Sequence, residues 1–171
     1  MYSKKLELNN KAKKKYLQFI KSQEILSEPF RDKLGQLNKF YLPLSKKIFN
    51  RKIKNNKTII VGLTGGQGSG KSTISNILKI ILKERFKLNT VIFSIDDFYK
   101  TLNERKIMAK KINPLFLTRG VPGTHDTKLL FFCLKQLKNL TKKILYIPKF
   151  DKSIDDRAPK SKWQKITYQP D

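Results

Sequence analysis

The spacing of hydrophobic and polar residues changes after residue 57. Before that point, in segments 13–26 and 30–44, apolar side chains recur at roughly the 3.6-residue period of an amphipathic helix. Pro43 marks a break or a kink in the second segment, because proline cannot donate the helical hydrogen bond. We therefore expect residues 1–57 to form a helical segment that packs on the main domain.

From Thr58 onward, apolar runs typical of strands alternate with helical patterns. Strands, the first of them buried on both faces, are predicted at 58–65, 89–97 and 144–151. Helices are predicted at 72–87, 101–111 and 127–140. Thr124 or Asp126 is a candidate N-cap for the last helix. This alternation is typical of a parallel sheet with crossover helices, so we expect residues 58–171 to form an α/β domain.

Three strands are few for a parallel sheet, which commonly has about five or six. The chain stops at KITYQPD, where a further apolar strand would be expected to begin. We therefore expect this domain to be incomplete at its C-terminus.

The chain has 171 residues and a formal net charge of +25, which raises the question of nucleic-acid binding. The positive excess is divided almost equally between residues 1–57 and 58–171, and Lys11–Lys15 is its only compact block. Lysines at the ends of apolar helices more often extend into solvent than bind a partner. Nucleic acid is therefore not expected to be the main partner.

Cys133 is the only cysteine, so the sequence predicts neither a disulfide framework nor a zinc-binding cysteine pair. The first residues lack the apolar core of a signal peptide, and no run approaches the length of a membrane helix. A reducing, cytoplasmic location without membrane contact is the expectation.

A glycine-rich loop follows the first predicted strand and precedes a predicted helix. GGQGSGKS, residues 65–72, matches the phosphate-binding pattern GxxxxGK[ST] in that context. Its N–H groups and the helix N-terminus would surround the phosphates of ATP. Lys71 would reach the β and γ phosphates, and the Ser72 hydroxyl would be a ligand of Mg²⁺. The nucleotide-binding residues are Gly65, Gly66, Gln67, Gly68, Ser69, Gly70, Lys71, Ser72 and Thr73.

Two carboxylates follow the second predicted strand. Asp96 and Asp97 lie where an α/β sheet binds its ligands, although one of them can instead cap the next helix. Adjacent strand residues point to opposite faces, so only one carboxylate can face the γ phosphate. A kinase needs such a carboxylate to accept the proton of the attacking hydroxyl, and Asp96 is the predicted base.

Five ordered blocks, GLTGGQGSGKST, SIDDFYKT, RGVPGTHD, IPKFDKS and DDRAP, together resemble the D-glycerate 3-kinase family. This family is a branch of the P-loop kinases, which also include uridine kinase, phosphoribulokinase and pantothenate kinase. The resemblance covers roughly residues 58–160 and implies a nucleoside-kinase-like fold. The family's pattern continues beyond residue 171 into a further strand and carboxylate, which places the activity of the 171-residue chain in question.

The resemblance implies that D-glycerate is phosphorylated by ATP with Mg²⁺ to a phosphoglycerate, 3-phosphoglycerate by analogy. By position, Asp96 and Lys71 are the catalytic residues, and Ser72 and Asp96 are the candidate metal ligands. The resemblance places the acceptor near Asp97, Tyr99, Arg119, His125, Asp126, Lys149, Asp151, Lys152 and Arg157.

A planar guanidinium group matches a carboxylate with two hydrogen bonds, so Arg119 or Arg157 is suited to bind the glycerate carboxylate. Plainer roles remain open: His125 can bond a backbone group in a turn, and Lys149 and Lys152 can be solvated. Alternative functions are a kinase with a nucleoside or pantothenate as acceptor, a nucleotide-binding module without turnover, and a basic nucleic-acid-binding protein. Oligomeric state is left open.

Overall fold

The computed structural model describes residues 8–24, 29–140 and 144–171. The chain divides into two compact units, Met1–Ile92 with Pro170–Asp171, and Phe93–Gln169. We describe each unit by itself. The domain boundary predicted after residue 57 rests on the change in the sequence pattern, and it stays a prediction.

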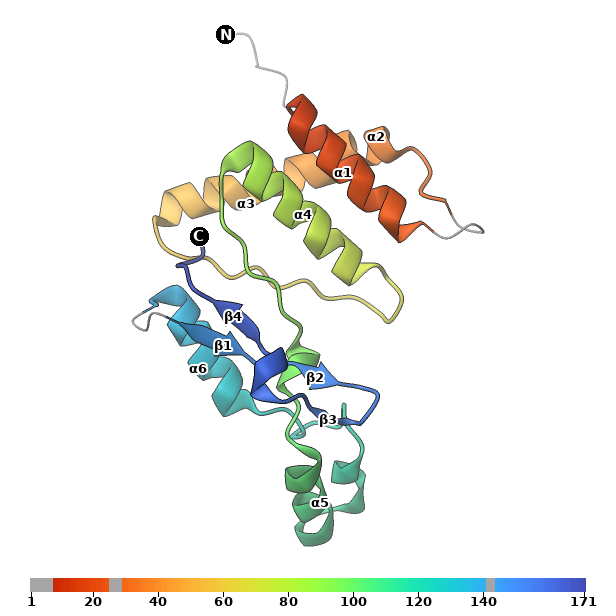
Figure 1. Ribbon diagram of the computed structural model, residues 1–171, viewed down its shortest axis with the longest axis vertical. Helices are drawn as coiled ribbons and strands as arrows, with labels where there is room; N and C mark the ends of the chain where they lie inside the picture. Colours follow the sequence, from red (N-terminus) through yellow and green to blue (C-terminus); the bar gives the residue numbers. More distant parts are fainter. Residues whose placement is uncertain (1–7, 25–28, 141–143) are drawn as a thin grey trace. The chain divides into compact units, whose positions relative to one another are not determined.

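The first unit is a group of packed helices. Its elements are α1 (Asn10–Gln23), α2 (Lys33–Gln36), the π-helical turn η1 (Leu37–Tyr41), α3 (Leu42–Asn55) and α4 (Lys71–Phe86). Helices α1 and α3 both pack against α4 (Figure 1). The predicted helical character of the first 57 residues is therefore confirmed within the described residues.

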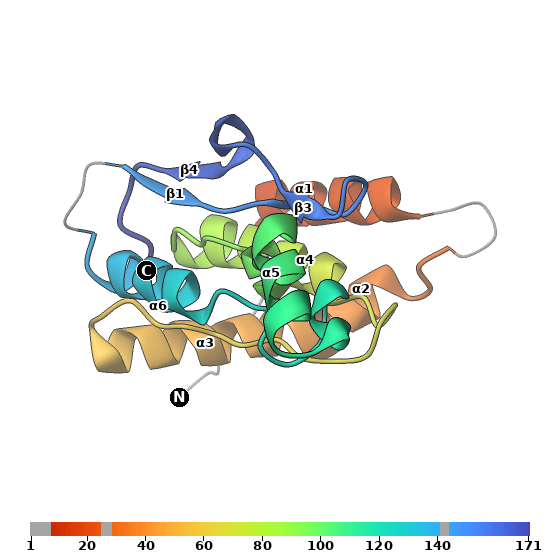
Figure 2. The ribbon, with the colours of Figure 1, turned by 90° about the horizontal axis from the view of Figure 1, so that it is seen from below.

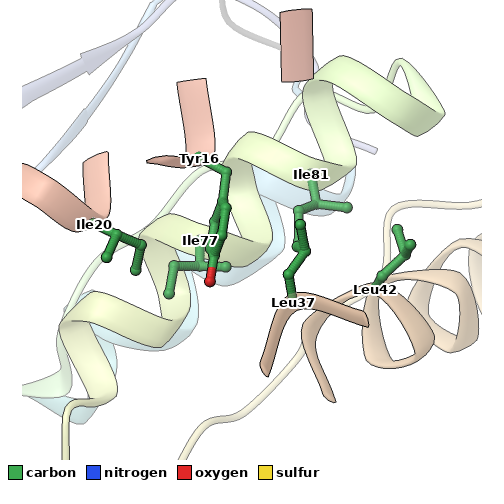
Figure 3. Packing of buried hydrophobic residues seen from close by; sticks show 6 residues of the cluster. All are labelled: Tyr16, Ile20, Leu37, Leu42, Ile77 and Ile81. Carbon is green, nitrogen blue, oxygen red and sulfur yellow. The ribbon is translucent and has the colours of Figure 1, made fainter. Parts of the chain in front are cut away.

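Apolar side chains at helical spacing form the core of this unit. The Asn9 side chain accepts a hydrogen bond from Ala12 N at 2.8 Å and so begins α1. Burying one leucine or isoleucine side chain contributes roughly 1.5–3 kcal/mol to the stability of the fold. The core cluster, drawn in Figure 3, comprises Tyr16, Ile20, Leu37, Leu42, Ile77 and Ile81.

The chain stays helical past Pro43, and the distortion expected there occurs just before it. Leu42 N–H bonds to Leu37 O, the five-residue step of a π-helix. Pro43 then falls in the first turn of α3, where its missing N–H is tolerated. The Ser45 hydroxyl donates to Tyr41 O, four residues earlier, at 2.8 Å.

The second unit mixes short helices and short strands. Its helical elements are η2 (Ile95–Phe98), α5 (Leu102–Lys111), η3 (Pro114–Leu117), α6 (Thr127–Lys138) and η4 (Lys160–Lys162). Its strands are β1 (Leu145–Ile147), β2 (Phe150–Asp151), β3 (Asp156–Arg157) and β4 (Gln164–Ile166). Strand β1 pairs antiparallel with β4 (Figure 2), and β2 pairs antiparallel with β3. Helix α6 packs on β1.

The helices of this unit begin at side-chain caps. Thr101 and Glu104 form a capping box at α5, in which Glu104 Oε2 accepts from Thr101 N at 2.7 Å. Asp126 Oδ1 accepts from Leu129 N at 3.0 Å, so Asp126 is the N-cap of α6. Thr124 instead closes the preceding turn through its hydroxyl, which donates to Val121 O at 2.6 Å.

The predicted parallel sheet is not confirmed. Among the described residues, the runs 58–65 and 89–94 contain no strand, and the third predicted strand becomes β1 and β2, whose partners run antiparallel. Ile60 and Val61 are 52% and 55% exposed, so the prediction that the first run is buried on both faces is wrong. A strand is defined by hydrogen bonds to a neighbour, and an apolar run alone does not supply one. No helix in the described part of the chain is long and apolar enough to cross a membrane.

Candidate nucleotide and acceptor sites

The phosphate-binding loop immediately precedes α4 in the first unit. Gly68 and Gly70 both have φ of 75°, a left-handed conformation that glycine adopts without strain. Gly70 is the N-cap of α4. Ser69 N and Ser69 Oγ donate to Gly66 O at 3.3 and 2.8 Å, which closes the turn. The loop therefore has a defined curl formed by its own backbone.

Lys71 is the first residue of α4, and its side chain folds back over this loop. Its Nζ donates to Gly65 O at 2.8 Å and to Gly66 O at 2.6 Å. Phosphate oxygens carry charge and are stronger acceptors for an ammonium group than carbonyl oxygens. A bound phosphate can therefore take over these contacts with only a local movement of Lys71.

Ser72 follows in the first turn of α4 and is exposed. Magnesium prefers hard oxygen ligands and usually combines one or two protein groups with substrate phosphates. The Ser72 hydroxyl fits that requirement and would be the Mg²⁺ ligand that this unit contributes.

The two adjacent aspartates occupy the short helix η2 and have different environments. Asp97 is 6% exposed and accepts hydrogen bonds from Ser94 N at 3.1 Å and Phe150 N at 3.3 Å. Lys149 Nζ lies 3.1 Å from its Oδ1. Asp97 thus completes the capping box of η2 and connects η2 to β2, whereas the next helix, α5, begins at the N-cap Thr101.

Asp96 is the more accessible carboxylate, with its side chain 39% exposed. Tyr99 Oη donates to its Oδ1 at 3.3 Å, and Lys152 Nζ lies 3.1 Å from its Oδ2. The carboxylate therefore has a fixed neighbour on each oxygen and still reaches solvent. This combination suits a group that must contact a substrate hydroxyl.

Tyr99 and His125 come from segments that pair through their backbones. They form an isolated antiparallel bridge, and their rings stack with centroids 4.3 Å apart at 30°. Burial raises the pKa of Tyr99, and the Asp96 charge adds to that effect. Burial lowers the pKa of His125, while Asp96 opposes the shift. His125 Nε2 is one of two buried side-chain nitrogens that have no hydrogen-bond partner within the described residues.

Arg157 makes hydrogen bonds within the protein through one terminal nitrogen of its guanidinium group. Its Nη2 donates to Tyr99 O at 2.8 Å and to Asp126 Oδ2 at 3.2 Å, while its Nε is the second buried nitrogen without a partner in the described part of the chain. Asp126 is also the N-cap of α6. These contacts give Arg157 and Asp126 a clear role in holding Tyr99 in place.

Arg119 is the more open of the two candidate arginines, with its side chain 35% exposed. Its Nη1 donates to Asp155 Oδ1, and its guanidinium carbon lies 5.9 Å from the centroid of the Phe150 ring. Its charge acts on Tyr99 and partly offsets the rise in that pKa caused by burial. The Arg119 charge is therefore close enough to Tyr99 to affect the ionisation of its hydroxyl.

The hairpin of β2 and β3 carries the remaining predicted residues. The Lys149 and Lys152 side chains are 60% and 62% exposed, yet each pairs with one of the two aspartates of η2. Asp151 accepts from Ser153 N at 3.0 Å and so shapes the hairpin turn. Each lysine is thus largely exposed to solvent and also pairs with one carboxylate, and its role toward the acceptor stays a prediction.

Sequence reasoning missed two residues of this region, Arg105 and Asp155. Arg105 is fully buried within the lysine-rich helix α5, although arginine is mostly exposed in proteins. Asp155 lies in the hairpin turn with φ of 51°, and its contacts with Arg105 span 50 residues of sequence. No local pattern could have revealed that pairing.

Comparison with known proteins gives these features a family context. The chain is 38% identical over 115 residues to the uncharacterized kinase mug58 of Schizosaccharomyces pombe, covering 64% of this chain and 41% of that protein. It is 34% identical over 130 residues to the chloroplastic D-glycerate 3-kinase of Arabidopsis thaliana, covering 70% of this chain and 28% of that protein. These relatives confirm the resemblance drawn from the sequence motifs.

A solved structure supports the same relationship. The D-glycerate 3-kinase from Cryptococcus neoformans var. grubii matches with a TM-score of 0.64 and 26% identity, over 75% of this chain and 48% of that chain. The chain spans less than half the length of each of these three proteins. Residues 60–171 match the model of the phosphoribulokinase / uridine kinase family. With its phosphate-binding loop and these kinase relatives, the chain belongs to the phosphoribulokinase / uridine kinase family.

Proposed function

We propose that the protein is an ATP-dependent kinase that transfers a phosphoryl group to a hydroxyl of D-glycerate. The observation that carries the proposal is the placement of Asp96, an accessible carboxylate with Lys152 at 3.1 Å. Arg119 lies in the same unit, pairs with Asp155 and has a side chain that is 35% exposed. A base beside cations suits an acceptor that has both a hydroxyl and a carboxylate. Two of the similar proteins, from Arabidopsis thaliana and Cryptococcus neoformans, are named D-glycerate 3-kinases.

The first unit supplies the donor side of this reaction. The loop N–H groups and Lys71 hold the β and γ phosphates of ATP, and the curl at Gly68 and Gly70 presents those groups together. The Ser72 hydroxyl would be a ligand of Mg²⁺, which would neutralise phosphate charge when bound.

The second unit supplies the acceptor side. Asp96 accepts the proton of the glycerate hydroxyl as its oxygen forms a bond to the γ phosphorus, and the bond from that phosphorus to the bridging oxygen breaks to release ADP. Arg119 binds the glycerate carboxylate through two parallel hydrogen bonds. Lys152 lies beside the base, where its charge reduces the repulsion between Asp96 and the phosphoryl group. By resemblance, the product is 3-phosphoglycerate.

A second acceptor class, a nucleoside, is favoured by the matched family, which includes uridine kinases. This alternative keeps the roles of Lys71 and Asp96 and changes only the acceptor. A reducing, cytoplasmic setting remains our expectation for either reaction.

The test is ADP release by the 171-residue chain with Mg-ATP and, separately, D-glycerate, uridine and pantothenate. The proposal expects ADP release to depend on D-glycerate and to exceed that with the other two acceptors. Dependence on uridine or pantothenate would replace the acceptor and keep the kinase. ATP binding without acceptor-dependent release would indicate a nucleotide-binding module and overturn the proposal for this chain.

A further inference from the structure

Asp155 forms ion pairs with two arginine side chains from different parts of the second unit. Arg105 comes from α5, and Arg119 comes from the segment that follows η3. Arg105 Nη2 lies 3.0 Å from Asp155 Oδ2, and Arg119 Nη1 donates to Asp155 Oδ1. One carboxylate thus joins a helix, a loop and the β2–β3 hairpin.

Arg105 is the fixed end of this arrangement because its side chain is 0% exposed. Its Nε donates to Lys100 O at 3.3 Å and its Nη1 to Leu117 O at 2.6 Å. Its Nη2 also donates to the backbone oxygen of Asp155. A buried guanidinium is stable only when it is paired and hydrogen-bonded, so Arg105 fixes both the backbone and the side chain of Asp155.

Arg119 is the open end. Its side chain is 35% exposed, and one of its terminal nitrogens is engaged by Asp155. Both arginines also lie against the Phe150 ring, with their guanidinium carbons 5.8 and 5.9 Å from its centroid. The carboxylate and the ring together restrict how the Arg119 plane can turn, and two-point binding of an acceptor carboxylate depends on that plane.

The carboxyl group of Asp155 keeps its charge in this setting. Partial burial opposes ionisation, but the hydrogen bonds from Arg119 and Arg105 outweigh it and lower the pKa of Asp155. The Asp155 carboxylate is therefore negatively charged near neutral pH.

We propose that Arg105 and Asp155 are positioning residues that orient Arg119 for the carboxylate of the acceptor. Selectivity for an anionic acceptor then resides in the three residues Arg105, Asp155 and Arg119. This inference rests on the proposed function and deepens it, because it names the source of discrimination between glycerate and an uncharged triol.

The experiment compares binding of D-glycerate and of glycerol, which has three hydroxyl groups and no carboxylate, by calorimetry on the full chain with saturating Mg-ADP. The variants are Asp155→Asn, Arg119→Gln and the double variant. Ile154→Ala, which changes a 58% exposed side chain in the same hairpin turn, is the matched control. Asp155→Glu keeps the charge and displaces it, and it provides a second measurement if Asp155→Asn does not fold.

The wild-type chain and Ile154→Ala should prefer D-glycerate over glycerol. Asp155→Asn and Arg119→Gln should each lower that preference by about tenfold, the size expected for a lost charge-assisted hydrogen bond. The double variant should be no worse than Arg119→Gln alone, because Asp155 acts through Arg119. Asp155→Glu should fall between wild type and Asp155→Asn.

Three results would overturn the inference: no preference for D-glycerate in the wild type, an undiminished preference in both Asp155 variants, or effects of Asp155→Asn and Arg119→Gln that multiply. A structural role alone would weaken both ligands equally in a folded variant. Failure of the proposed function can be distinguished from failure of the inference. ADP release measures kinase activity. The ratio of the affinities for D-glycerate and glycerol measures the orientation of Arg119.

Discussion

Tyr99 and Asp96 are joined by a hydrogen bond across one short turn, with Tyr99 Oη 3.3 Å from Asp96 Oδ1. The Tyr99 ring stacks on the His125 ring. Tyr99 therefore orients the carboxylate that the proposed reaction uses as its base, while the aromatic stack keeps the hydroxyl in place.

Replacing Tyr99 by phenylalanine removes this hydrogen bond and keeps the stacked ring. Because the bond is long and partly exposed, we expect kcat for the acceptor reaction to fall by about threefold to tenfold. The KM for ATP should not change. Steady-state kinetics with varied ATP and acceptor measure both quantities, and an unchanged kcat would show that Tyr99 does not orient Asp96.

The two aspartates of η2 should separate catalysis from stability. Asp96→Asn should lower turnover by at least about a hundredfold, as loss of a general base does, and change the free energy of unfolding by less than about 0.5 kcal/mol. Asp97→Asn should lower that free energy by about 1–3 kcal/mol, because its buried oxygens accept from Ser94 N and Phe150 N. Urea unfolding and ADP release measure the two effects. The reverse assignment would follow if Asp97→Asn abolished turnover in a chain of normal stability.

His125 is the only histidine, so its ring protons give one titration curve by NMR. Burial lowers its pKa from the ordinary value of 6.5, and the folded chain therefore disfavours the charged ring. The stability associated with the neutral ring is intact above pH 6.5 and is lost as the pH falls from 6.5 through the folded pKa. A titration midpoint at or above the ordinary value would contradict the buried environment.

Cys133 should report unfolding of the second unit. It is 0% exposed, and burial raises the pKa of its thiol to about 11. At pH 8 only roughly one thiol in a thousand would be the reactive thiolate, even with full access. We expect no reaction with a disulfide reagent in the folded chain and one thiol per chain in denaturant. Rapid labelling of the folded chain would show that α6 does not pack as described.

The helices could be predicted because the information for them is local. Ile77 and Ile81 are one turn apart in the sequence and both are fully buried on α4. Asp126 precedes α6 at the spacing that an N-cap requires. The strands were harder, because an apolar run such as residues 58–65 does not specify the neighbour that would complete a ladder.

The same distinction applies to the candidate sites. The loop that contains Lys71 is a continuous motif, so its glycines and its helix start could be read directly from the sequence. The partners of Asp96 include Lys152, which is 56 residues away, and only family resemblance brought Lys152 to attention. The pairing of Arg105 with Asp155 escaped notice because it depends on tertiary packing, although Asp155 opens the DDRAP block.

The central claim is tested most directly by following the phosphoryl group itself. Phosphorus NMR of the 171-residue chain with Mg-ATP and D-glycerate, beside Asp96→Asn, identifies both products. The account predicts equal amounts of ADP and a phosphoglycerate in the wild-type reaction and neither above background with Asp96→Asn. A folded chain that binds ATP and forms no phosphoglycerate, or an Asp96→Asn variant that forms it at the wild-type rate, would contradict the account.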